Sequence, residues 1–146
     1  MADAKRRIAR RELLQRFVPG RALLAPPQVT LDRALCTGCG LCARDCPKGA
    51  IMLSGEPRLE VIFWSERCDA CGLCVEACPE RCLQMMSAAP QQAGPVVLFE
   101  DEVVRCDRCG DGIGGRSMIE RLRARLGPVR TASILLCPSC RRSGRG

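Results

Sequence analysis

The chain has 146 residues and a formal charge of +7, from 23 Lys and Arg against 16 Asp and Glu. Its length allows one domain of ordinary size or two very small ones. Histidine and tyrosine are absent, which excludes His-ligated metal sites and His-based acid–base catalysis. Aromatic residues make up 3% of the chain, fewer than a protein that stacks nucleic-acid bases would need.

The charges are unevenly distributed along the chain. Residues 34–104 carry five Lys/Arg against ten Asp/Glu, whereas residues 1–33 carry eight against three and residues 105–146 carry ten against three. Two basic ends therefore flank an acidic middle. We expect these ends to dock on a partner protein, because charge of one sign attracts a complementary surface.

The first 28 residues are predicted to be a basic extension. Within them, residues 3–18 read as a helix, since Ala9, Leu13 and Phe17 follow one another at four-residue intervals. The pair Arg10-Arg11 is similar to a twin-arginine export signal, but the apolar run that should follow it is interrupted. We therefore expect a cytoplasmic protein, and no stretch reaches the eighteen apolar residues that indicate a membrane span.

Two segments, 36–47 and 68–79, carry the same spacing, C-x2-C-x2-C-x3-C-P, and a shift of 32 residues superimposes them. This spacing is typical of [4Fe–4S] clusters, because three cysteines on one loop reach three irons and the fourth points elsewhere. The total of thirteen cysteines is odd, and closely spaced pairs favour metal binding in a reducing compartment over a disulfide framework. Such a repeat also predicts two similar halves packed around a pseudo-two-fold axis.

The paired motifs resemble the bacterial dicluster ferredoxins. The resemblance implies an α+β, ferredoxin-like fold, which we place at residues 29–86 with a strand at 58–64. It also implies one-electron transfer through two [4Fe–4S] clusters without bond-making catalysis, so we expect an electron-transfer protein and no enzyme. The resemblance assigns one cluster to Cys36, Cys39, Cys42 and Cys78, and the other to Cys68, Cys71, Cys74 and Cys46.

Five cysteines remain outside this assignment. Cys82 stands where the first copy has Ala50, so we expect it to pack as a small apolar side chain. The other four form C-x2-C-G and C-P-x-C pairs that together offer a tetrahedral thiolate site, with Cys106, Cys109, Cys137 and Cys140 as its ligands. We expect zinc there; a mononuclear iron, a cluster and an inter-subunit site are the alternatives.

These four cysteines define a predicted metal-knuckle module at 96–146, after a linker at 87–95. The module should begin with a strand at 96–104 and contain a helix at 117–126. Ser117 is placed to cap that helix, and Gly127-Pro128 to end it.

A ferredoxin segment followed by this module also resembles the small iron–sulfur subunit of formate-hydrogenlyase and group 4 hydrogenase complexes. That resemblance implies redox protein partners, such as larger oxidoreductase subunits, and no small-molecule substrate of its own. The alternative is a nucleic-acid-binding iron–sulfur or zinc protein that uses its basic ends to contact phosphate. The scarcity of aromatic residues and the acidic middle argue against it.

Overall fold

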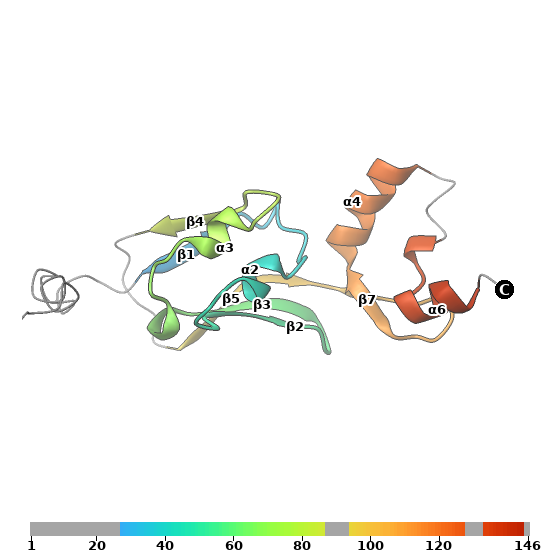
Figure 1. Ribbon diagram of the computed structural model, residues 1–146, viewed down its shortest axis with the longest axis horizontal. Helices are drawn as coiled ribbons and strands as arrows, with labels where there is room; N and C mark the ends of the chain where they lie inside the picture. The colour runs from blue at the N-terminus through green and yellow to red at the C-terminus, as the bar shows by residue number, and fades with distance from the viewer. Residues whose placement is uncertain (1–26, 87–93, 128–132, 145–146) are drawn as a thin grey trace, which may run out of the picture.

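The computed structural model describes residues 27–86, 94–127 and 133–144. The basic extension up to residue 26, with its predicted helix, and residues 87–93 of the predicted linker lie outside the described residues. Within the described ranges the strands form three small antiparallel sheets, ordered β1-β4, β2-β3-β5 and β6-β7. Figure 1 shows the first two sheets together, and the third at the far end of the molecule. The fold is a mixture of helix and strand, as predicted.

The two cysteine segments carry the same elements. Each segment contains a short helix and is followed by a strand, again at a shift of 32 residues: α2 (Leu41–Arg44) and β2 (Ile51–Ser54) in the first copy, and α3 (Leu73–Glu76) and β4 (Leu83–Met86) in the second. Each copy is also preceded by a strand, β1 (Gln28–Leu31) or β3 (Leu59–Trp64), and a 3-10 turn at Ser65–Arg67 follows β3. The sequence repeat is therefore a repeat of structure, while a pseudo-two-fold axis stays a prediction.

The sheets join the two halves to each other. β1, which precedes the first copy, pairs with β4, which follows the second. In the same way β3 precedes the second copy and pairs with β2, which follows the first. Neither half can therefore complete its strand pairing alone, and the two cysteine segments are held side by side, with α2 in contact with α3.

β3 supplies the centre of the apolar core, and the strand predicted at 58–64 is confirmed. Leu59, Val61 and Phe63 alternate with less buried neighbours along this strand, because successive side chains of a strand point to opposite faces. Residues from the neighbouring elements complete the core: Val29, Ala50, Ile51, Leu83 and Phe99.

The segment predicted as one strand at 96–104 forms two strands that belong to different sheets. β5 (Pro95–Asp101) pairs with β3, whereas β6 (Val103–Arg105) pairs with β7 (Gly112–Gly115). Glu102 lies between β5 and β6 and belongs to neither strand. Phe99 lies opposite Val61 and is 5% exposed. The first strand of the predicted 96–146 module thus completes the sheet and the core of the preceding segment, because β3 would otherwise leave an open edge.

The remaining elements form what we call the C-terminal unit, residues 103–127 and 133–144. It contains the β6-β7 hairpin, α4 (Arg116–Leu126) and α6 (Pro138–Ser143), and it lies beyond the end of β5 (Figure 1). The predicted helix at 117–126 is confirmed, and Gly127, with φ of +70°, ends it. The prediction that Ser117 caps the helix is wrong. Gly115 occupies the cap position, and the backbone N–H of Ser117 donates to Asp101 Oδ2 at 2.8 Å.

Candidate iron–sulfur and metal sites

Five cysteines line one cavity in residues 29–86, which we call the dicluster segment after the fold predicted for it. Four of them are the predicted ligands Cys36, Cys39, Cys42 and Cys78, which we call the first cysteine set, and the fifth is Cys82. The fourth member, Cys78, comes from the second sequence copy, so this set draws on both copies.

A second cavity is lined by the other four predicted ligands. They are Cys46, Cys68, Cys71 and Cys74, which we call the second cysteine set. Here Cys46 comes from the first copy and the other three from the second, so the exchange of the fourth cysteine is mutual.

Backbone N–H groups point at sulfur atoms in both sets. The N–H of Gly38 donates to Cys36 Sγ at 3.4 Å, and that of Ala50 donates to Cys46 Sγ at 3.3 Å. The first contact requires the left-handed backbone of Gly38, with φ of +63°. Such N–H donors stabilise negative charge on sulfur, which is the form in which cysteine binds metal.

The electrostatics of the two cavities favours a bound, positively charged iron–sulfur core over empty cysteine sites. Burial, followed by repulsion from Cys39 and Cys36, raises the pKa of Cys42 to about 12. Burial and then repulsion from Cys68 and Cys46 also raise the pKa of Cys74. Four thiolates in such a cavity therefore need positive charge among them, and an iron–sulfur core with about +2 supplies it when bound.

Cys82 is packed as expected and also touches the first cysteine set. It is 5% exposed, and its Sγ lies 3.4 Å from Cys78 Sγ. Burial, followed by the hydrogen bond with Cys78, raises the pKa of Cys82, so this group stays a neutral thiol at pH 7. Ala50, at the equivalent place in the other half, is equally buried and offers no sulfur.

The C-terminal unit brings together the four remaining cysteines. The sulfur atoms of Cys106, Cys109, Cys137 and Cys140 all lie within 4.8 Å of one another. Four sulfurs at about 2.3 Å from one tetrahedral ion stand roughly 3.8 Å apart, so small adjustments would place a single zinc or iron among them.

Two turns position these thiols. Cys106 and Cys109 lie on the turn of the β6-β7 hairpin, where Cys106 N–H donates to Asp111 O at 2.7 Å and Gly110 N–H to Cys106 O at 2.9 Å. Cys137 caps α6, and its side chain accepts from the N–H of Cys140. The N–H of Asp107 donates to Leu135 O at 3.0 Å, which ties the two turns together.

One thiol of this site is prepared for metal binding. Cys106 accepts N–H bonds from Cys137, at 3.3 Å, and from Cys109, and these lower its pKa to about 6. This thiol therefore loses its proton more readily than an ordinary cysteine does, which favours capture of a cation.

Sequence reasoning missed the charged side chains beside the two cysteine sets. Glu80 lines the first cavity, and Lys48 and Asp69 line the second. Lys48 and Glu80 are equivalent under the 32-residue shift, so the change of charge sign within an otherwise matched repeat was visible in the sequence. The arginines that pair with Glu80 come from α4 and gave no local signal.

Comparison with known proteins agrees with the site over part of the chain. Residues 28–79 match the family described as a 4Fe-4S dicluster domain, and this range contains both cysteine sets. The match covers less than half of the chain. It supports a ferredoxin-type iron–sulfur protein and an electron carrier, with no support for a nucleic-acid-binding role. No curated protein matches the chain.

None of the helices in the described part of the chain has the length and apolar character of a membrane span.

Proposed function

We propose that this protein passes single electrons through two [4Fe–4S] clusters. The first cysteine set holds one cluster and the second cysteine set holds the other. The observation that carries the proposal is the exchange of Cys46 and Cys78 between the two cavities. Eight cysteines divided in this way supply four thiolates at each of two sites, the donor set that a cubane requires.

The bound clusters would supply reversible one-electron reduction. The chain's own residues hold the cysteine loops together, exclude water from part of each site and direct N–H groups at sulfur. The interleaved sheets keep the two sites in one small unit, since strands from both halves pair with each other.

We further propose that the four C-terminal cysteines hold one structural metal ion, with zinc as the first choice and mononuclear iron as the alternative. The C-terminal unit offers few buried apolar side chains, among them Ile119. A segment of that size does not fold on burial alone and gains stability from a metal.

The place of the protein in the cell also belongs to this proposal. The closely spaced cysteines favour a reducing, cytoplasmic compartment. The basic ends favour a subunit or dedicated donor of a larger oxidoreductase, such as a hydrogenase-type complex, over a freely diffusing carrier. Purification of the tagged protein from its native cells under anaerobic, low-salt conditions tests this point. Recovery of the chain in stoichiometric complex with a redox enzyme supports it, and recovery of the chain alone contradicts it.

Iron and acid-labile sulfide analysis tests the electron-transfer proposal. Anaerobically purified protein should contain about eight cluster irons and as many sulfides per chain, and dithionite should produce EPR signals of two interacting clusters. About half that content after full reconstitution, or iron without labile sulfide, would contradict two cubanes.

A further inference from the structure

Glu80 connects the first cysteine set to a distant helix. It lies in the loop between Cys78 and Cys82 and lines the same cavity as these cysteines. Its side chain is 17% exposed. A carboxylate in this position disfavours additional negative charge in the cavity, since charges in a partly buried site are weakly screened.

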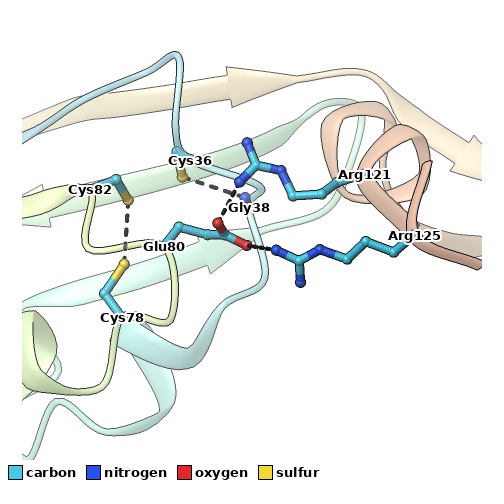
Figure 2. A network of polar contacts seen from close by, with 7 residues as sticks. All are labelled: Cys36, Gly38, Cys78, Glu80, Cys82, Arg121 and Arg125. Atoms are coloured by element: carbon cyan, nitrogen blue, oxygen red, sulfur yellow. Dashed lines mark hydrogen bonds and ion pairs between the residues drawn. The ribbon is translucent and has the colours of Figure 1, made fainter. Parts of the chain in front are cut away.

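Two arginines of α4 neutralise this carboxylate. Arg121 Nη1 forms an ion pair with Glu80 Oε2, and Arg125 Nη2 lies 3.7 Å from Glu80 Oε1. Figure 2 shows both side chains reaching from α4 to the carboxylate, with the sulfurs of Cys36, Cys78 and Cys82 on its other side. The two arginines are four residues apart and so share one face of the helix.

The second cysteine set has a different arrangement of charge. Lys48 stands at the place equivalent to Glu80 and lies 4.0 Å from Asp69, which lines the same cavity. One cation and one anion cancel there. Beside the first cysteine set, one anion meets two cations, and both cations belong to the C-terminal unit.

We propose that Arg121 and Arg125 tune the first cysteine set, so that the C-terminal unit raises the reduction potential of the centre held there. An electron that arrives at this set adds negative charge, which nearby cations stabilise and a bare Glu80 would oppose. The inference rests on the proposed function. It assigns the C-terminal unit a role in electron transfer beyond its own fold, through two arginines that offset the charge of Glu80.

Replacement of Arg121 has a matched control on the same helix. Arg121→Gln and Arg123→Gln each remove one positive charge from α4. Arg123 is exposed and projects about 200° around the helix from Arg121. Each variant is first analysed for iron and labile sulfide, and the midpoint potentials of both clusters are then measured by EPR-monitored titration with dithionite.

We expect Arg121→Gln to lower one midpoint potential and leave the other in place, while Arg123→Gln shifts neither by a comparable amount. Glu80→Gln should move the same midpoint upward, because it removes the anion. Arg121→Lys should retain the wild-type value, because it keeps the positive charge. A purely structural role would not produce opposite shifts from the two partners.

Two results would overturn the inference. One is full iron content with unchanged midpoints in both Arg121→Gln and Glu80→Gln; the other is an equal shift in Arg123→Gln. Should Arg121→Gln lose its iron, the upward shift in Glu80→Gln decides the question. The proposed function is tested separately by the iron and labile sulfide content of the wild type. Two clusters there uphold that function whatever the variants show, whereas a wild type without labile sulfide refutes it.

Discussion

Gly38 and Ala70 occupy the same place in the two cysteine loops and share a left-handed backbone, with φ of +63° and +60°. The conformation turns their N–H groups toward Cys36 and Cys68. Alanine is accommodated in the second loop but has no room in the first. A Cβ on Gly38 would lie 2.5 Å from Leu59 Cδ2.

Gly38→Ala should therefore be more costly than the same change at Gly49, which is not among the residues that line the two cavities. Gly49 has φ of +59°, and a Cβ added there would meet no atom within 4 Å, so its replacement costs only backbone strain of about 1–2 kcal/mol. At Gly38 the overpacking against Leu59 adds about 1–3 kcal/mol. The temperature at which each variant loses its cluster absorbance, measured anaerobically, reports the difference. Equal losses would contradict the crowding at Gly38.

Cys82 contacts the first cysteine set but is excluded from our ligand assignment. Cys82→Ala should keep about eight irons, because Cys36, Cys39, Cys42 and Cys78 still supply four thiolates. Cys78→Ala, its counterpart 3.4 Å away, should lower the iron content. Iron analysis compares the two variants. If Cys82 were the true fourth ligand, Cys82→Ala would lose iron and Cys78→Ala would keep it.

β5 is the element that most changes the domain picture, because it brings Phe99 into the core of the dicluster segment. Phe99→Ala should destabilise that segment by about 3–5 kcal/mol, the cost of a cavity left by a buried aromatic ring. Glu100→Ala, on the exposed neighbour in the same strand, should change stability by less than about 0.5 kcal/mol. Thermal loss of cluster absorbance compares the two. If Phe99→Ala lowered stability no more than Glu100→Ala does, β5 would contribute little to this core.

The sequence predicted the elements whose signals are local. The strand-forming composition of 58–64 indicated β3, and the glycine after 117–126 indicated the end of α4. The resemblance to the dicluster ferredoxins implied which thiols share a cavity, since the fourth cysteine of each motif in that family ligates the other cluster.

The features that the sequence did not predict depend on contacts between distant segments. Nothing within 96–104 indicates that β5 pairs with β3 or that Asp101 accepts from Ser117. The same holds for the ion pair of Glu80 with Arg121. Ser117 was expected to cap α4 because of its neighbours in sequence. The acceptor at the start of the helix is Asp101 of β5 instead, a partner that local propensity does not encode.

The molecule as a whole combines the dicluster segment with a C-terminal unit that, on our proposal, is stabilised by its own metal ion. The double change Cys137→Ser and Cys140→Ser should remove one bound metal ion and raise protease sensitivity after Glu102, because the unit then has too small a core to stay folded. β5 should stay protected, and both clusters should stay reducible. Ser139→Ala, in the same turn and exposed, is the control.

Metal analysis and limited proteolysis measure these effects together. Loss of about eight irons in the double variant would show that the dicluster segment needs the C-terminal unit for its own fold. In the wild type, one zinc per chain supports a structural site. One extra iron without labile sulfide would make that site a third redox centre instead.

The exchange of cysteines between the two cavities is tested most directly by paired replacements that include Cys46. This residue is the better choice of the two exchanged cysteines, because Ala50 stands where Cys82 lies in the other half, and no spare thiol occupies that place. Cys46→Ala with Cys71→Ala removes two ligands of the same set. Cys46→Ala with Cys39→Ala removes one ligand from each set.

Labile sulfide and iron are then measured in both double variants after anaerobic reconstitution. We predict that the first pair retains about four irons, because one cluster keeps all its ligands, and that the second pair retains far fewer, because both clusters are damaged. The reverse result, with about four irons in the Cys39 and Cys46 variant and almost none in the Cys46 and Cys71 variant, would show that each sequence copy holds its own cluster and would contradict the structure proposed for the two sites.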